Sequence, residues 1–449
     1  MRGALPWFAS VAVALTCHAE RPNIVIILAD DLGYGDVGVC NPDAKIPTPH
    51  IDRLASEGML FTDAHAASAT CTPSRYGLLT GINPARTGVL NTTLQQGIPI
   101  ISGNEPTLGA FLQERGYTTR MVGKWHLGFE GGKAATKKIT SDKPLSGGPL
   151  DRGFESFFGI PSSPGEPPLC LIRDRALTDS EGFHQEQLSP SLCREAVEMI
   201  HAHAEANTGK PLFLYYASPL PHKPWVPTEE FQGKSGVGDY GDFVMQLDDV
   251  VGRIAGALRE TGLEKNTLLI FTSDNGPSPP AVESMNAIGH DSAGGLRGQK
   301  SDAWEGGHRV PMIVKWPGHV PAGTRSKALV NATDLLATIA GILDSQPYPS
   351  AVDSVSFLPV LTDPAASHSR PPMVTARHAI RHANWKLLSS RRQADAGELN
   401  LADFSLYDLD ADLAESTDLL ATHRGQADPL FTAFQQFTKE RVLKVRSQP

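Results

Sequence analysis

Asn23-Ile-Val-Ile-Ile-Leu28 is an almost entirely apolar run that leads directly into Ala29-Asp30-Asp31-Leu-Gly-Tyr-Gly35. Such a β-branched run is typical of a strand that is buried on both faces of a parallel sheet. In open α/β sheets ligands bind at the carboxyl ends of the strands, and Asp30 and Asp31 follow this strand there. A single aspartate would be expected to cap a turn or a helix, but two acids before a glycine-rich loop favour a hard cation with oxygen ligands.

A second strand ends in the same way. Residues 267–271 form another buried run, which continues into Thr272-Ser-Asp-Asn-Gly276, so Asp274 and Asn275 repeat the first pattern. Three carboxylates and one amide, with no His or Cys among them, suit Ca²⁺ or Mg²⁺ better than Zn²⁺. The repetition is the strongest indication of a metal site that the residues alone provide.

A thiol stands just before a predicted helix in Cys71-Thr-Pro-Ser-Arg75. Pro73 suits the first helical position, which would place Cys71 at or near a helix N-terminus, where backbone amides and the helix dipole favour an anion. Arg75 lies one turn further on and is expected to face the same point. A lone cysteine is more often a buried structural residue. The acids, lysines and histidines in the other loops favour a functional site.

Lys124 and His126 lie in residues 117–128, which we interpret as a strand that runs into a loop. Two residues apart in an extended segment, they would share one face of the strand. A lysine and a histidine at a strand end can neutralise an anion and move a proton. A solvated edge strand explains this segment equally well when it is considered alone.

His222 and Lys300 complete the candidate residues. His222 follows a third buried strand, residues 211–217, in a loop that three prolines stiffen. Lys300 lies in the glycine-rich residues 294–311, before a strand at 312–316. A single loop lysine is usually solvated, but Lys300 is a candidate for contact with an anion.

The succession of strands and helices predicts an α/β fold with a large mixed, mostly parallel sheet that helices flank. Glycine and proline signals place these helices at residues 49–58, 105–116, 190–206, 243–261 and 331–342. We expect a catalytic α/β domain over residues 20–344 and a smaller C-terminal α+β subdomain over residues 345–449. The subdomain would contain an antiparallel sheet (residues 373–388 and 406–409) and a helix over 427–443. The irregular residues 130–190 are interpreted as substrate-facing loops.

The composition restricts the setting of the protein. A net charge of −9 over 449 residues argues against non-specific nucleic-acid binding. Residues 1–19 resemble a signal peptide, with Arg2 before an apolar stretch of about a dozen residues, which predicts export to the periplasm or the medium. A lipoprotein cysteine at Cys17 is a weaker alternative. No other run is long enough to span a membrane, and Cys40, Cys170 and Cys193 permit at most one disulfide.

Taken together, these stretches resemble the type I, formylglycine-dependent sulfatases of the alkaline phosphatase superfamily. Residues 71–75 match the family's C-x-P-x-R signature, which extends through Leu78-Leu-Thr-Gly81, and Gly123-Lys-Trp-His-Leu-Gly128 matches its second signature. The resemblance is close over residues 23–316. It implies that a maturation enzyme oxidises Cys71 to formylglycine. One hydroxyl of the hydrated aldehyde would attack sulfur, and collapse of the other would release sulfate.

The resemblance also implies a role for each candidate residue. Asp30, Asp31, Asp274 and Asn275, together with residue 71, would bind one Ca²⁺ ion. Arg75 would hold the diol, and Lys124 and Lys300 would balance the charge of the sulfate. His126 would accept the diol proton, and His222 would protonate the leaving alcohol.

The expected substrate is a sulfated carbohydrate. Residues 148–154, 159–175 and 305–309 are similar to sulfatases that act on galactose or N-acetylgalactosamine 6-sulfate. Three alternatives remain open: a phosphodiester or phosphonate monoester hydrolase with the same nucleophile, a non-catalytic sulfoglycan-binding protein, and a zinc phosphatase. The complete set of site residues argues against the binding protein, and the lack of histidines beside the acid pairs argues against zinc.

Overall fold

The computed structural model describes residues 21–89, 99–103, 105–130, 144–165, 169–178, 184–376, 378–389 and 399–446. The predicted signal peptide at residues 1–19, including Cys17, lies outside the described residues.

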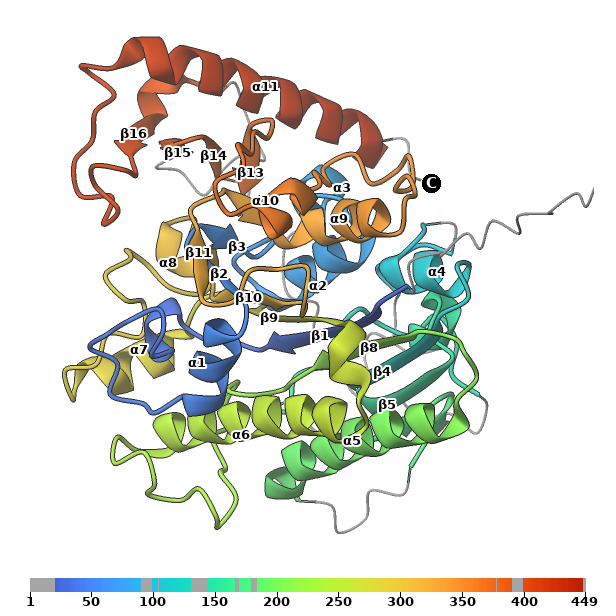
Figure 1. Cartoon of the computed structure of the whole chain (residues 1–449). Helices are drawn as coiled ribbons and strands as arrows, with labels where there is room; N and C mark the ends of the chain where they lie inside the picture. Colours follow the sequence, from blue (N-terminus) through green and yellow to red (C-terminus); the bar gives the residue numbers. More distant parts are fainter. Residues whose placement is uncertain are drawn as a thin grey trace, which may run out of the picture.

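β1 (Asn23–Ala29) lies near the middle of a large mixed sheet (Figure 1). Within the described ranges this sheet has ten strands, in the order β11-β2-β10-β9-β1-β8-β4-β5-β6-β7. β1 pairs in parallel with β8 and β9, β8 pairs in parallel with β4, and β4 pairs in parallel with β5. β10 runs antiparallel to its neighbours β9 and β2, while β11 runs parallel to β2. The other strands of this sheet are β2 (Met59–Phe61), β4 (Thr118–Lys124), β5 (Ser156–Ile160), β6 (Ile172–Arg173), β7 (Ala176–Leu177), β8 (Leu212–Ala217), β9 (Thr267–Ser273), β10 (Met312–Lys315) and β11 (Thr324–Ser326).

Alternating side chains of β1 divide the core into two layers. Ile24, Ile26 and Leu28 pack on one face with α2, α4 and α9, whereas Val25 and Ile27 pack on the other face with α1, α5 and α6. Figure 1 shows α5 and α6 on the opposite side of the sheet from α2 and α9. These helices are α1 (Pro49–Ser56), α2 (Cys71–Thr80), α4 (Leu108–Gln113), α5 (Leu188–Ala206), α6 (Asp239–Glu260) and α9 (Leu335–Ile342).

The C-terminal region forms its own small antiparallel sheet, which has four strands among the described residues. The strands are β13 (Met373–Thr375), β14 (Ala379–His382), β15 (Trp385–Ser389) and β16 (Phe404–Asp408), and α11 (Arg424–Arg446) lies against them. The predicted fold class is therefore confirmed. The domain boundary after residue 344 stays a prediction. Phe357, Val360 and Leu361 beyond it pack into the core of the large sheet.

Several predicted elements differ in their limits. Residues 130–190 contribute β5, a parallel strand of the large sheet, so this stretch is not made of loops alone. The predicted helix at 331–342 begins only at Leu335, because Val330–Asn331 pairs with Ala64–His65 as β12 and β3. α6 starts at Asp239, four residues before the predicted Phe243.

Short helices account for most of the other connections. They are α3 (Pro84–Thr87), α7 (Pro279–Asn286), α8 (Glu305–His308) and α10 (Leu358–Thr362). None of the helices in the described part of the chain has the length and apolarity that crossing a membrane requires. Cys40, Cys170 and Cys193 are unpaired within the same part.

Candidate active site

The acids that follow β1 and β9 meet at the carboxyl ends of these paired strands. The backbone N–H of Asp31 donates to Asp274 Oδ1 at 3.2 Å, and Asn275 Nδ2 donates to Asp31 Oδ1 at 2.8 Å. Asp30, Asp31, Asp274 and Asn275 are all at most 1% exposed. The parallel pairing of the two strands thus brings together side chains that are about 240 residues apart in the sequence.

Cys71 lies at the start of α2 and faces the same acids. Its Sγ is 3.4 Å from Asp30 Oδ1 and 3.8 Å from Asp31 Oδ1. The helix begins at Cys71 itself, so Pro73 is its third residue and not its first, which corrects the sequence prediction. The position is compatible with proline because the first four N–H groups of a helix have no intrahelical acceptor.

Arg75 is one turn further along α2 and is also directed into the acid cluster. Its Nη2 and Nε donate to Asp274 Oδ2 at 2.7 and 3.1 Å, and its Nη1 donates to the carbonyl oxygen of Lys124 at 2.9 Å. Nη2 is also 3.6 Å from Asp30 Oδ2. The guanidinium therefore joins the ends of β1, β4 and β9.

Lys124 and His126 reach the site by different means. Lys124 ends β4, and its Nζ donates to Asp30 Oδ2 at 2.7 Å. His126 lies beyond the strand with φ of +57°, so strand alternation does not orient it, contrary to the sequence argument. The side chain is buried, and neither ring nitrogen has a hydrogen-bond partner among the described residues. Burial and the charge of Lys124 hold the pKa of His126 well below its usual range, so the ring is neutral.

Lys300 and His222 lie on the more open side of the acid cluster. Lys300 Nζ donates to Asp31 Oδ1 at 2.5 Å, and its side chain is 15% exposed. His222 Nδ1 is 2.6 Å from the carbonyl oxygen of Lys223, which fixes a proton on that nitrogen. Its Nε2 then points toward Asp31 Oδ2, 3.8 Å away. All ten residues predicted from sequence thus lie in one region.

The electrostatics of this region are dominated by burial and by mutual charge. Burial would raise the pKa of Asp30, but the nearby cations, Lys124 foremost, hold it well below its usual range. Burial raises the pKa of Asp274 to about 6, and the charge of Asp30 adds to this effect. Burial also raises the pKa of the Cys71 thiol well above its usual range. An unmodified Cys71 is therefore a protonated thiol and a poor nucleophile.

The residues present fit a hard divalent cation. Single ligand atoms of Asp30, Asp31, Cys71 and His222 lie within 4.8 Å of one another. Asp31 Oδ2 and Asn275 Oδ1 are buried without a hydrogen-bond partner in the part of the chain that is described. Buried oxygens of this kind require a partner, and a cation with oxygen ligands would provide it.

The sequence analysis missed residues that orient the loops. Ser273 Oγ accepts from the backbone N–H of Leu32 at 3.2 Å and donates to the carbonyl oxygen of Asn275 at 2.9 Å. It therefore joins the two acid-bearing turns. Its place directly before Asp274 was the only available signal.

Comparison with known proteins assigns the family. The family described as Sulfatase matches residues 22–345, which is most of the chain and includes every residue of the site. The chain belongs to the sulfatase family. As a sulfatase, it is a sulfuric ester hydrolase, and the predicted resemblance is confirmed.

Individual sulfatases are similar over nearly the whole chain. An N-acetylgalactosamine-6-O-sulfatase of Bacteroides thetaiotaomicron is 33% identical over 90% of this chain and 91% of its own length. Human arylsulfatase A is 34% identical over 93% of this chain and 87% of its own. A solved structure, reported for the metabolism of multiple glycosaminoglycans by Bacteroides thetaiotaomicron, has a TM-score of 0.83 at 30% identity and covers 94% of this chain and 100% of that chain.

Proposed function

We propose that this sulfatase removes sulfate from a sulfated carbohydrate, with formylglycine derived from Cys71 as nucleophile and one bound Ca²⁺ ion. Asp30, Asp31, Asp274, Asn275 and residue 71 would hold the ion. The observation that carries the proposal is the convergence of residue 71 and the buried acids that follow β1 and β9. Among the described residues, Asp31 Oδ2 and Asn275 Oδ1 there have no hydrogen-bond partner.

The modified residue 71 and the bound ion would each supply defined chemistry. Formylglycine at position 71 would supply a hydroxyl as nucleophile, and Ca²⁺ held by the neighbouring acids would supply positive charge that polarises a sulfate and favours the ionised hydroxyl. The side chains around residue 71 would position the reacting groups and neutralise their charge. Lys124 and Lys300 place two ammonium groups beside the acids, where they balance the charge of a sulfate. Arg75 is fixed by three hydrogen bonds, to Asp274 and to the Lys124 carbonyl, and would hold the nucleophile at residue 71.

The two histidines divide the proton transfers. His126 is neutral and both of its ring nitrogens are unpartnered among the described residues, so it is suited to accept a proton from the second hydroxyl at residue 71. His222 has its Nδ1 proton directed to the carbonyl of Lys223, so its Nε2 is the atom that would protonate the leaving alcohol. His126 is fully buried, which suits a base beside the nucleophile. His222 is partly exposed, which suits an acid beside the substrate.

The substrate class follows from the relatives. Relatives named N-acetylgalactosamine-6-sulfatase support a galactose or N-acetylgalactosamine 6-sulfate as the substrate. We further propose export after removal of residues 1–19, a formylglycine-generating enzyme as maturation partner, and a catalytic domain over residues 20–344 with a subdomain over 345–449.

The test is a desulfation screen of enzyme that has been co-expressed with a formylglycine-generating enzyme. Defined 2-, 3-, 4- and 6-sulfated galactose and N-acetylgalactosamine substrates are compared with an aryl sulfate and an aryl phosphate diester. We expect sulfate release to be fastest from the 6-sulfated sugars and to vanish in Cys71→Ala. A large preference for the phosphate diester would contradict the proposal and support a phosphoester hydrolase.

A further inference from the structure

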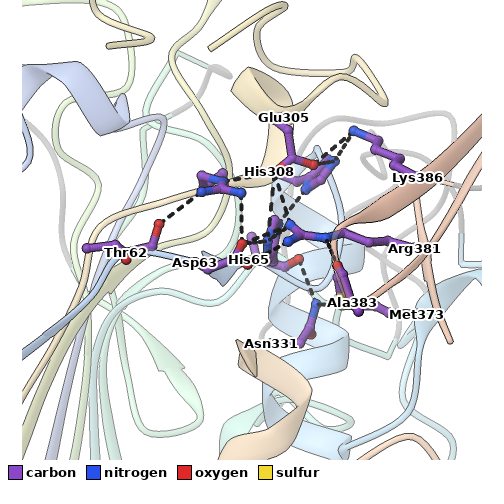
Figure 2. Close-up of polar contacts among 12 residues, drawn as sticks. Thr62, Asp63, His65, Glu305, His308, Asn331, Met373, Arg381, Ala383 and Lys386 are labelled. Carbon is purple, nitrogen blue, oxygen red and sulfur yellow. Dashed lines mark hydrogen bonds and ion pairs between the residues drawn. The ribbon is translucent and has the colours of Figure 1, made fainter. Parts of the chain in front are cut away.

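A second buried cluster of charged side chains lies between the C-terminal sheet and α8 (Figure 2). It is made of Asp63, His65, Glu305, His308, Arg309, Arg381, Lys386 and Glu415. Arg381 is on β14 and Lys386 is on β15, whereas His65 is on β3 and Glu305 and His308 are on α8. The cluster therefore joins the C-terminal sheet to β3 and α8.

Glu305 is at the centre of this cluster. Its Oε1 accepts from Lys386 Nζ at 3.0 Å, and its Oε2 accepts from Arg309 Nε at 2.8 Å and from Arg381 Nη1 at 3.3 Å. Its backbone N–H donates to Glu415 Oε2 at 2.7 Å. Three of these four partners, Arg381, Lys386 and Glu415, come from the C-terminal region. Glu305, Lys386 and Glu415 are fully buried.

The cluster does not suit a second metal ion. Ligand atoms of His65, Glu305 and His308 do lie within 4.8 Å of one another. However, the Nδ1 atoms of the two histidines lie 2.9 Å apart, His65 Nε2 lies 2.9 Å from Asp63 Oδ1, and His308 Nε2 lies 3.2 Å from the carbonyl oxygen of Ala303. Each ring nitrogen therefore already has a hydrogen-bond partner. Both oxygens of Asp63 and of Glu305 accept hydrogen bonds from arginine or lysine, whereas the acid cluster of the active site keeps Asp31 Oδ2 and Asn275 Oδ1 without a hydrogen-bond partner among the described residues.

α8 is in direct backbone contact with two segments that lead to or carry residues of the active site. The N–H of Gly276, next to Asn275, donates to the carbonyl oxygen of Gly307 at 3.0 Å. The N–H of Ala66, which leads to Cys71, donates to the carbonyl oxygen of His308 at 2.8 Å. A Cβ added to Gly276 would lie 1.8 Å from the oxygen of Gly306, so no space separates α8 from the acid-bearing turn.

The segment that carries Lys300 contacts the same elements. The N–H of Lys300 donates to the carbonyl oxygen of Pro277 at 2.9 Å. The N–H of Ser301 donates to the carbonyl oxygen of Ala69 at 2.8 Å. The N–H of Gly306 in turn donates to the carbonyl oxygen of Arg297 at 2.7 Å. The position of α8 thus restricts the segments that bear Asn275, Cys71 and Lys300.

We propose that Glu305 is a positioning residue through which Lys386, Arg381 and Glu415 of the C-terminal region hold α8, and with it the metal-binding turn and Lys300, in place. The C-terminal region then contributes to turnover without touching the reacting atoms. The inference rests on the proposed function in one respect, namely that Lys300 and Asn275 act on sulfate and Ca²⁺.

The test compares Lys386→Met with Arg86→Met. Lys386→Met keeps the length of the side chain and removes the charge that pairs with Glu305. Arg86, on α3, joins the same two regions elsewhere, through Asp353 at 2.7 Å and Glu440 at 2.7 Å, and has no part in α8. Glu415→Gln is the milder second variant if Lys386→Met does not fold. Each protein is measured below its own melting temperature.

Three quantities are measured: Ca²⁺ affinity by calorimetry, kcat and KM on an aryl sulfate, and hydrogen exchange of the Gly276 and Ser301 amides. We expect Lys386→Met to weaken Ca²⁺ binding roughly 10-fold and to lower kcat about 10- to 100-fold with a smaller change in KM. Amide exchange at Gly276 and Ser301 should accelerate in Lys386→Met but not in Arg86→Met, even if the two variants have the same melting temperature.

Equal changes in Ca²⁺ affinity, kcat and amide exchange in the two variants would overturn the inference. A loss of activity that follows only the melting temperature would reflect general destabilisation. Failure of the proposed function has a different signature. Wild type would then hydrolyse no sulfate ester, while the difference in exchange between the two variants would still support the positioning role of Glu305.

Discussion

At the scale of single residues, two left-handed backbone conformations decide where site side chains point. Asp31 has φ of +69° and His126 has φ of +57°, and each follows the end of a strand of the large sheet. Such conformations cost on the order of 1–3 kcal/mol and gather at functional sites. The sequence predicted both residues as members of the site but not their conformations, because tertiary contacts, such as the His126 N–H donating to the Pro161 carbonyl, determine them.

Asp31→Asn tests the metal site. The substitution keeps the shape of the side chain but removes the charge of a carboxylate whose Oδ2 has no hydrogen-bond partner among the described residues. We expect Ca²⁺ affinity to fall by at least about 10-fold, because ligand charge sets calcium affinity. Asp248→Asn is the matched control, since Asp248 is also buried but, within the described part of the chain, accepts from the backbone amides of His50 and Ile51 at the start of α1 and lies away from the site. Isothermal titration calorimetry measures both, and equal affinities in the two variants would exclude Asp31 as a ligand.

His222→Asn tests the leaving-group acid. A general acid contributes about 10²- to 10⁴-fold when the leaving group is a poor one, such as a sugar alcohol. We therefore expect a much larger loss of kcat/KM on a sugar sulfate than on a nitrophenyl sulfate, whose leaving group needs little protonation. His201→Asn, at a partly exposed position on α5, should change neither rate. The same loss on both substrates would remove His222 from the role of acid.

At the scale of elements, glycine contacts between neighbouring turns hold the site together. Gly276→Ala would place a methyl group 1.8 Å from the carbonyl oxygen of Gly306. We expect the free energy of unfolding to fall by about 1–3 kcal/mol, together with a loss of activity. Gly256→Ala in α6, where a Cβ would meet nothing within 4 Å, should instead stabilise the protein by about 0.5–1 kcal/mol. Denaturant unfolding measures both variants. An unchanged free energy of unfolding in Gly276→Ala would contradict the close contact of these turns.

Elements with strong apolar runs were predictable from sequence, whereas those made by tertiary contacts were not. β1, β8 and β9 were identified because strands buried on both faces are continuous apolar runs. β5 was missed because its five residues lie within a stretch rich in glycine and proline, whose composition is typical of loops. α8 was missed because its four residues include two glycines and owe their conformation to the surrounding turns.

At the scale of the whole molecule, buried histidines make stability depend on pH. Burial lowers the pKa of both His65 and His308 from the ordinary value of 6.5, and Lys386 lowers that of His308 further. Below pH 6.5 the unfolded chain therefore takes up protons that the folded protein does not, and the folded state loses stability as the pH falls. Above that pH these histidines are neutral in both states, so they no longer lower the free energy of unfolding.

His308→Gln should therefore flatten the acid side of the stability profile. Each such histidine contributes a slope of up to about 1.4 kcal/mol per pH unit. We expect the slope of the free energy of unfolding below pH 6.5 to decrease in this variant, whatever its absolute stability. His201→Gln on the surface should leave the slope as in wild type, and denaturant melts over this pH range measure all three proteins. An unchanged slope in His308→Gln would show that His308 is not buried as a neutral ring.

The arrangement of the whole molecule follows from where parallel strands end. Parallel pairing places the carboxyl ends of β1, β4, β8 and β9 at one edge, which is why acids, lysine and histidines from distant segments could be predicted to meet. The contacts of the C-terminal sheet with α8 and β3 could not be predicted in this way. Arg381, Lys386 and Glu415 resemble ordinary surface charges in the sequence, and only the packing of the small sheet against α8 buries them.

The central claim is that an oxidised side chain at position 71, beside the buried acids, performs the reaction. Its most direct test is to prepare the enzyme with different levels of the maturation enzyme and to determine the formylglycine fraction of the Cys71 peptide by mass spectrometry. We predict that kcat for an aryl sulfate rises in proportion to that fraction and extrapolates to zero when none is converted. Full activity in a preparation whose residue 71 is entirely unmodified thiol would contradict the account.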